Sequence, residues 1–289
     1  MLILKSSGVE QEFMPGKILK VIEYAAQGHN IDPYELLSET SKQIKDGMTS
    51  KEVQSVLVRV SSNRITKEQP DYQFVTANLK MLEIRKEVYG QHEPIPFIDH
   101  ISKMVNENRY DKEILQKWSA EEISILEKNV KHERDFTFSY AGIQNLSEKY
   151  LIKDKQKSTL LETPQYAYML IGMCLHQDEK ENRLKYAIDF YNAASLQKIS
   201  LPTPIMAGVR SPVRQFSSCV VIESGDSLNS INAASNSIVH YISKRAGIGI
   251  NAGMLRAQGS KIGSGEVVHT GVIPFWKHFQ TAVKSCSQG

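Results

Sequence analysis

Residues 214–222 read Arg-Gln-Phe-Ser-Ser-Cys-Val-Val-Ile, and the fold of the surrounding chain can be worked out from this stretch. The part from Phe216 to Ile222 is rich in β-branched and aromatic residues, which predicts a buried strand. Cys219 lies within that strand, after two small serines that leave space for a ligand. The chemistry of this region therefore centres on a thiol held by regular secondary structure.

A turn, a helix and a second strand are expected next. Residues 225–227 read Gly-Asp-Ser, which predicts a turn. Apolar side chains recur at helical spacing from Leu228 to Ile242, and Asp226 is the expected N-cap of that helix. Residues 246–251 predict another strand. The order strand, helix, strand is typical of a parallel βαβ unit.

A glycine-punctuated loop follows the second strand and carries Arg256 and Lys261. We interpret it as a flexible basic loop suited to phosphate. Residues 247–252 also fit the glycine pattern of a dinucleotide fingerprint, and Glu266 lies at a suitable distance from it. We reject a dehydrogenase, because that fingerprint needs a helix to begin at the glycines, and glycines at 253, 259, 263 and 265 disfavour one.

Composition sets limits on the class of protein. The chain has 289 residues, 41% of them hydrophobic and 23% charged, which is ordinary for one large or two modest globular domains. A net charge of +3 argues against nucleic acid or an anionic membrane as the main partner. The three cysteines show neither a disulfide pattern nor zinc-ligand spacing, so we expect no metal and a reducing, cytoplasmic location. No apolar run approaches membrane length.

Residues 1–91 predict a small separate domain in the order ββαααα. Residues 3–5 and 9–13 form the expected hairpin, and four amphipathic helices follow, of which the third opens with the capping pair Thr49 and Glu52. Lys5, Lys17 and Lys86 could converge on one end of this domain as a triphosphate pocket. The alternative is that they belong to a solvated surface, which is the commoner fate of lysines.

Residues 92–200 predict a strongly charged helical domain. The boundary before it is the stretch 89–96, which contains a glycine and two prolines. Cys174 lies in an apolar helix and is expected to be a buried, inert thiol. Prolines on both sides of Thr203 then interrupt the helical pattern, so its hydroxyl either faces a ligand or belongs to a simple turn.

Cys219 itself has two interpretations. It is either a small hydrophobic residue that fills a strand or a redox thiol beneath a substrate pocket. Composition cannot decide between them, because two-electron thiol chemistry needs a second cysteine and no nearby Cys-x-x-Cys supplies one.

Five motifs together resemble the large, catalytic subunit of class Ia ribonucleotide reductase, especially bacterial and T-even-type phage members. They are Ser-Leu-Pro-Thr-Pro-Ile-Met at 200–206, Arg-Gln-Phe-Ser-Ser-Cys at 214–219, Gly-Asp-Ser-Leu at 225–228, Arg-Ala-Gly-Ile-Gly-Ile-Asn at 245–251 and His-Phe-Gln-Thr-Ala-Val-Lys-Ser-Cys-Ser-Gln-Gly at 278–289. The resemblance covers the whole chain. It implies an α/β fold with a helical N-terminal part: an ATP-cone at 1–91, a helical domain at 92–200, and at 201–289 the first strands and helices of a ten-stranded α/β barrel.

The resemblance also implies roles for individual residues. Cys219 matches one of the two thiols that reduce the 2' carbon of a ribonucleoside diphosphate. Further positions match the substrate site, namely Thr203, Ser218, Ala246 and Gly247. The site that binds deoxynucleoside triphosphate specificity effectors matches Asp226, Ser227, Leu228, Arg256, Ile262, Gly263, Ser287 and Gln288. The cone, which takes ATP or dATP, matches at Lys5, Gln11, Lys17, Ile18, Ser50 and Lys86.

Some positions depart from the family pattern. Ser6, Gln11, Met14, Ser50 and Gln54 stand where better-studied bacterial members often have more strongly liganding groups, which leaves dATP inhibition open. Gly263 stands where some members have a phosphate-contacting arginine, so Arg256 is expected to bear more of the effector's charge.

The resemblance finally implies partners and a missing part. The sequence ends before the family's thiyl-radical cysteine, its second redox cysteine and its C-terminal thiol tail. We therefore expect a truncated or split subunit, inactive alone, that needs the C-terminal portion and a small subunit with a di-iron tyrosyl radical. Thioredoxin or glutaredoxin is the expected reductant, and the helix at 228–242 the expected homodimer contact. The alternative is a non-catalytic module that binds nucleotides.

Overall fold

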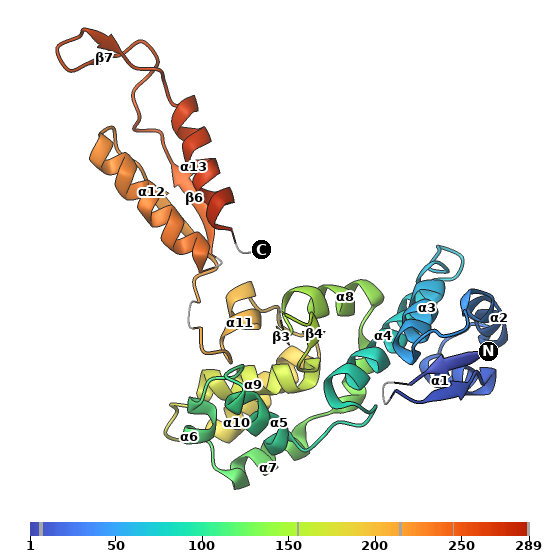
Figure 1. Ribbon diagram of the computed structural model, residues 1–289. Coiled ribbons are helices and arrows are strands. Elements are labelled where there is room, and N and C mark those ends of the chain that lie inside the picture. The colour runs from blue at the N-terminus through green and yellow to red at the C-terminus, as the bar shows by residue number, and fades with distance from the viewer. Residues whose placement is uncertain (6–7, 155, 214–215, 245, 288–289) are drawn as a thin grey trace. The chain divides into compact units, whose positions relative to one another are not determined.

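The computed structural model describes residues 1–5, 8–154, 156–213, 216–244 and 246–287 (Figure 1). The chain divides into two compact units, Met1–Leu201 with Arg210–Pro212, and Pro202–Val209 with Val213–Gly289. The predicted site residue Gln288 lies outside the described residues, as does Ser6, which was named as a departure from the family pattern. Within the described part, no helix combines the length and the apolar character needed to cross a membrane.

The first unit begins with the predicted ββαααα order. Strands β1 (Leu2–Leu4) and β2 (Glu10–Glu12) pair as an antiparallel hairpin. The helices are α1 (Pro15–Ala25), α2 (Pro33–Gln43), α3 (Ser50–Ser62) and α4 (Tyr72–Tyr89). Their buried apolar faces meet in one core, which includes Ile22, Leu36, Leu57 and Leu79. The capping box of Thr49 and Glu52 is confirmed at the start of α3.

The rest of this unit is mainly helical. Its elements are α5 (Phe97–Asn106), α6 (Glu113–Lys117), α7 (Ala120–Asn129), the 3-10 helix η1 (His132–Thr137), α8 (Tyr140–Lys149), β3 (Lys153–Asp154), β4 (Thr159–Leu160), α9 (Pro164–His176) and α10 (Arg183–Ser195). The expected helices are present, and β3 and β4 add a short antiparallel hairpin that was not predicted. Strands of two residues are too short to leave a periodic signal.

Helix α4 joins the first four helices to the later ones. Arg85 on α4 forms a buried ion pair with Asp135 of η1, at 2.7 Å between Nη2 and Oδ2. The stretch 90–96 has irregular backbone, as predicted, but residues on both sides of it belong to one compact unit. The division of residues 1–200 into two domains therefore stays a prediction.

A buried polar network lies within the helical part and was not predicted from sequence. Arg210 and Glu162 are both fully buried and form an ion pair. Tyr110 donates a hydrogen bond of 2.8 Å to Glu162, and His100 lies 3.0 Å from the same phenol oxygen. Cys174, expected to be buried, is only partly so, because it lies at the end of α9 next to the exposed Leu175.

The second unit contains the predicted βαβ arrangement. Its elements are α11 (Thr203–Gly208), β5 (Cys219–Glu223), α12 (Leu228–Ser243), β6 (Gly247–Asn251), β7 (Lys261–Ile262), β8 (Val267–Val268) and α13 (Ile273–Cys286). Strands β5 and β6 are parallel, with Cys219 opposite Gly247. Gly249 lies inside a strand, which confirms that no dinucleotide-binding helix begins there. The described strands form no closed barrel.

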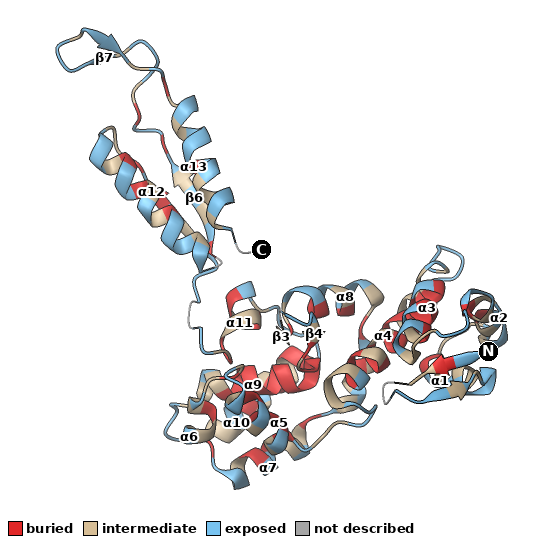
Figure 2. Cartoon of the chain, viewed as in Figure 1, coloured by how far each residue is buried: buried red, intermediate tan, exposed pale blue. Residues whose placement is uncertain are grey.

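Only one face of the β5–β6 sheet is packed. Ile222 is 9% exposed and lies in a core with residues of α12 and α13, whereas its neighbour Val221 is 81% exposed. Figure 2 shows the same contrast along α12, where a buried stripe faces the sheet and the opposite side is exposed. The expectation of a buried strand from Phe216 was therefore wrong in two respects: the strand begins at Cys219, and its second face is open.

Candidate functional site

The Cys219 thiol lies on the open face of the sheet. It is the first residue of β5 and is exposed and free. Residues 219, 221 and 223 share this face, because side chains alternate along a strand, and all three are exposed. The structure therefore excludes the interpretation of Cys219 as a residue that fills a core within this unit. Its thiol is accessible to a ligand.

Gly247 keeps the space beside this thiol open. Its backbone N–H donates a hydrogen bond of 2.8 Å to the carbonyl oxygen of Ser218, which fixes the two strand ends together. A Cβ atom at position 247 would lie 3.6 Å from the Cys219 Sγ and 3.4 Å from the Ser218 oxygen. Ala246, the preceding residue, is 2% exposed and points away from this space into the unit. Both distances are ordinary van der Waals contacts, so an alanine at 247 would touch the thiol without displacing it.

Thr203 is placed at the first position of α11 and is exposed. The structure has a short helix here instead of the simple turn that was one alternative. Pro204 is tolerated because it lies in the first turn of α11, where the backbone N–H that proline lacks has no partner within the helix. Among the described residues, no hydrogen bond joins Thr203 to Ser218 or Cys219. Their grouping around one substrate stays a prediction.

Asp226 and Arg256 form the best-defined polar pair of the second unit. Arg256 Nε lies 2.6 Å from Asp226 Oδ2, and the Arg256 backbone N–H donates to Oδ1 at 3.1 Å. This backbone hydrogen bond and the guanidinium together hold the pKa of Asp226 below its ordinary value. Arg256 Nη1 also donates to the carbonyl oxygen of Lys261 at 2.9 Å. Two residues predicted to bind an effector are thus brought together.

The expected N-cap of α12 needs correction. Ser227, not Asp226, caps the helix, and its hydroxyl accepts a hydrogen bond from the Ser230 backbone N–H at 3.2 Å. Asp226 cannot serve because its carboxylate is occupied by Arg256, thirty residues further along the chain. Leu228 begins the helix and is 75% exposed.

The glycine-rich loop contains an unpredicted hairpin. Strands β7 and β8 pair with Lys261 opposite Val268 and Ile262 opposite Val267. Gly263 turns the chain with φ of +56°, a value that favours glycine. Ser287 is the C-cap of α13. Among the described residues, no hydrogen bond links Ser287 with Asp226 or Arg256.

The three predicted lysines of the cone lie near one another. Burial and then the positive charges of Lys17 and Lys86 lower the pKa of Lys5. A charge effect of this kind requires short separations, because salt water screens longer ones. Lys5, which follows β1, therefore lies within electrostatic reach of Lys17 near the start of α1 and of Lys86 in the last turn of α4.

Three further residues were assigned to the cone site by resemblance. Gln11 lies in β2, Ile18 in α1 and Ser50 at the start of α3, and all three are half-buried. Within the part of the chain that the structure describes, no hydrogen bond joins the side chains of Gln11, Ile18 or Ser50 to Lys5, Lys17 or Lys86. Their part in nucleotide binding stays a prediction.

Acidic residues on α4 face α3, which the sequence did not suggest. Ser55 Oγ donates to Glu83 at 2.9 Å, and Lys51 forms an ion pair of 2.8 Å with Glu87. Gln54, one of the departures from the family pattern, donates to the carbonyl oxygen of Leu79 at 3.0 Å. The available signal was the spacing of three or four residues within each helix, between 51 and 54 or 55 on α3 and between 83 and 87 on α4. Such spacing places side chains on one face of a helix.

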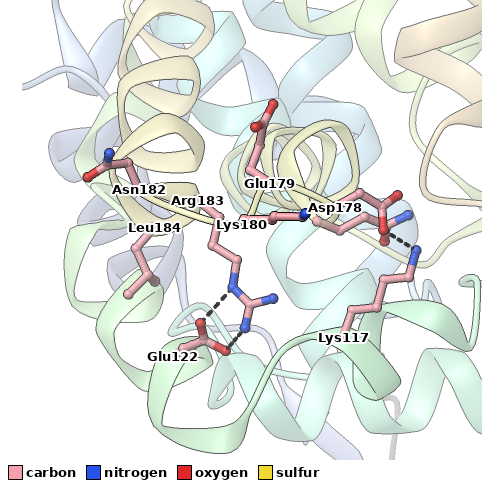
Figure 3. Close-up of a pocket in the computed structure, with 9 residues that line it drawn as sticks. Lys117, Glu122, Asp178, Glu179, Lys180, Asn182, Arg183 and Leu184 are labelled. Atoms are coloured by element: carbon pink, nitrogen blue, oxygen red, sulfur yellow. Dashed lines mark hydrogen bonds and ion pairs between the residues drawn. The ribbon is translucent and has the colours of Figure 1, made fainter.

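Two hollows lie away from all of these residues. The larger, about 730 Å³, lies in the first unit and is lined by charged residues around the segment between α9 and α10. Figure 3 shows two of its cations engaged by acids: Arg183 binds Glu122 through two hydrogen bonds, and Lys117 pairs with Asp178. The smaller hollow lies between α12, β6 and α13 and is mostly apolar.

Three stretches of the chain match known protein-family descriptions. The description "ATP cone domain" matches residues 1–87. The description "Ribonucleotide reductase, all-alpha domain" matches residues 136–214, and "Ribonucleotide reductase, barrel domain" matches residues 217–289. Each predicted part of the chain thus has a counterpart.

Curated relatives match nearly the whole chain. It is 62% identical over 287 residues to the ribonucleoside-diphosphate reductase subunit alpha of Enterobacteria phage T4, covering 99% of this chain. It is 46% identical over 291 positions to ribonucleoside-diphosphate reductase 1 subunit alpha of Escherichia coli strain K12, and 28% identical over 276 to the subunit alpha of Helicobacter pylori. The chain spans 38% of the length of the first two relatives and 34% of the third.

Proposed function

We propose that the chain belongs to the ribonucleotide reductase large-subunit family and forms part of a ribonucleoside-diphosphate reductase completed by further polypeptide. The observation that carries the proposal is the exposed Cys219 thiol on the open face of a parallel β5–β6 pair, with Gly247 leaving space beside it. A thiol in this position suits a substrate bound against the strand ends.

In the proposed reaction, Cys219 supplies one of two thiols. The 2' carbon of a ribonucleoside diphosphate loses its hydroxyl as water and gains hydrogen. The two thiols lose two electrons and two protons and join as a disulfide, so electrons and atoms balance. The second thiol and the thiyl radical that starts the reaction belong to the rest of the subunit, and thioredoxin or glutaredoxin restores the dithiol. Thr203, Ser218 and Gly247 would line the substrate site beside Cys219. Ala246, whose side chain is buried, would take part only through its backbone.

The proposal divides the chain into three functional parts. Residues 1–91 form the ATP-cone, residues 92–200 a helical domain, and residues 201–289 the start of the barrel. The lysine cluster of the cone supports binding of ATP or dATP phosphates. The Asp226–Arg256 pair, with Ser227, Leu228, Ile262, Gly263, Ser287 and Gln288, would form the specificity site for deoxynucleoside triphosphates.

The proposed partners follow from the same assignment. A small subunit with a di-iron tyrosyl radical would generate the thiyl radical. A second copy would pack against α12, whose exposed positions include the apolar residues Leu228 and Val239 on one flank of the helix and Tyr241 on the other. The cytoplasm, with its reducing environment, is the proposed location.

A second candidate is a nucleotide-binding module without catalytic activity. The convergence of Lys5, Lys17 and Lys86 favours it, because this cluster needs nothing from the rest of the subunit. The two proposals differ in whether Cys219 has a role.

Complementation separates them. The chain is mixed with a polypeptide carrying the remainder of the phage T4 relative's subunit alpha and with the matching small subunit, and CDP reduction is measured. We expect turnover that Cys219→Ser abolishes and that the matched control Cys174→Ser retains. Turnover that survives Cys219→Ser would contradict the reductase proposal. Binding of ATP without any turnover would favour the module.

A further inference from the structure

The 3-10 helix η1 binds the C-terminal part of α4 through a buried ion pair. Arg85 of α4 places its Nη2 2.7 Å from Asp135 Oδ2, and the same nitrogen donates to the carbonyl oxygen of His132 at 2.6 Å. The two charged side chains are 6% and 0% exposed. The other carboxylate oxygen of Asp135 has no hydrogen-bond partner among the described residues. Loss of the arginine contact would therefore leave a buried, poorly compensated charge.

Phe136, the next residue of η1, contacts both α4 and α1. The Arg85 Cζ lies 4.8 Å from the centre of the Phe136 ring. Tyr24 of α1 meets the same ring edge-on, with 5.6 Å between the ring centres. Cation–π and edge-to-face contacts favour these two geometries. The turn thus joins two helices of the cone, although Asp135 lies 50 positions after Arg85.

The same turn is fixed to the helical part of the chain. Arg134 Nη1 donates to Asn192 Oδ1 and to Ser195 Oγ of α10, both at 2.9 Å. Just before η1, the Lys131 backbone N–H donates to the Tyr191 hydroxyl of α10 at 2.8 Å. These hydrogen bonds make η1 a fixed support for α4 and α1.

The two supported helices carry two of the cone lysines. Lys86 follows Arg85 on α4, about 100° further around the helix. Lys17 precedes Tyr24 by nearly two turns of α1, so both side chains leave that helix on the same face. Because side chains project from a helix at fixed angles, contacts that set the rotation of α4 and α1 also set the directions of Lys86 and Lys17.

We propose that Asp135 is a positioning residue of the cone's nucleotide site, although it lies outside residues 1–91. Through Arg85, and with Phe136 beside it, Asp135 holds α4 and α1 so that their lysines point at one phosphate chain. This inference rests on the proposed binding of ATP or dATP by the cone and names a part of the helical segment on which that binding depends. The dependence is reciprocal, so bound ATP must in turn stabilise η1.

The test uses the full chain with ATP as the probe. Calorimetry gives the dissociation constant for the original chain, Asp135→Asn and Glu162→Gln. The two variants are matched, because each replaces the buried carboxylate of an ion pair in the first unit with its amide. No described hydrogen bond joins Glu162 to residues 1–91. Urea unfolding checks that each variant is folded under the binding conditions.

A second measurement needs no substitution. Hydrogen exchange of the original chain, followed by mass spectrometry with and without ATP, reports the protection of the amides of residues 132–137. It remains decisive if Asp135→Asn does not fold.

We expect Asp135→Asn to weaken ATP binding at least about fivefold and Glu162→Gln less than about twofold, as coupling between separate sites predicts. ATP should also slow the exchange of the η1 amides. Unchanged affinity in a folded Asp135→Asn variant, or equal losses in the two variants, would overturn the role of Asp135. Protection of α1 and α4 by ATP without protection of η1 would overturn it too. In those cases the original chain still binds ATP and only this inference fails, whereas a chain that does not bind ATP removes the proposed cone site itself.

Discussion

Neighbouring residues of β5 should respond in opposite ways to truncation. Ile222 is 9% exposed and packs against α12 and α13, whereas Val221 is 81% exposed on the face that carries Cys219. Ile222→Ala removes three buried carbons, worth roughly 2.4 kcal/mol at about 0.8 kcal/mol each, and the cavity left behind brings the cost to about 2–4 kcal/mol. Val221→Ala should cost less than about 1 kcal/mol, mainly through strand propensity.

Urea unfolding measures this difference within the second unit. The chain has two tryptophans, Trp118 in the first unit and Trp276 in the second. A Trp118→Phe background therefore leaves Trp276 fluorescence as the reporter. The indole nitrogen of Trp118 makes no hydrogen bond with the described residues, so its removal forfeits none. At a slope of about 2 kcal/mol per molar urea, the middle of the usual range, Ile222→Ala should lower the midpoint by about 1–2 M. Equal shifts for Ile222→Ala and Val221→Ala would show that both faces of the sheet are packed.

Three more outcomes follow from other contacts. Thr49→Ala breaks the capping box of α3 and should cost the first unit about 1 kcal/mol, measured as a lower urea midpoint; an unchanged midpoint would contradict the role of the cap. Burial lowers the pKa of His100 from 6.5 to about 4. Between these two pH values the unfolded chain binds a proton on His100 and the folded chain does not, so the first unit should lose stability as pH falls from 6.5 towards 4. His100→Gln should flatten part of that loss, and an identical pH profile would show that His100 does not contribute. Cys219 is the exposed cysteine, so its reaction with a thiol reagent should be the fast phase, and that phase should vanish in Cys219→Ser; a fast phase that remains would place the reactive thiol elsewhere.

Local sequence was sufficient where the structure depends on neighbouring residues. The hairpin at the N-terminus, the four helices after it and the Thr49–Glu52 cap were predicted from spacing and confirmed. The parallel pairing of β5 with β6 was also predictable, because a helix between two strands favours that order.

Local sequence failed where distant residues decide. Aspartate and serine are both favourable N-cap residues. In the structure Ser227 is the N-cap of α12, while the carboxylate of Asp226 binds Arg256. A run of valines and isoleucines is compatible both with a strand packed on one face and with a strand packed on both faces. The sequence therefore did not reveal that one face of β5 is open. The burial of Arg210 with Glu162 likewise joins residues 48 positions apart.

The candidate site was predicted mainly through resemblance. The pattern around Cys219 allowed either a core thiol or a redox thiol, and the structure removed the first choice by leaving the side chain exposed. The three lysines of the cone were named from the sequence, and the structure supports their clustering. Lys261 was assigned only to a basic loop, because the contact of its carbonyl oxygen with Arg256 depends on a hairpin whose strands are two residues long.

The most direct test of the central claim is the redox state of Cys219 after a single turnover. The complemented enzyme is reduced, freed of external reductant and given CDP, and its cysteines are mapped by mass spectrometry. The account predicts that Cys219 becomes disulfide-bonded, to a cysteine of the added polypeptide, in proportion to the dCDP formed. Formation of dCDP while Cys219 remains a free thiol would contradict it.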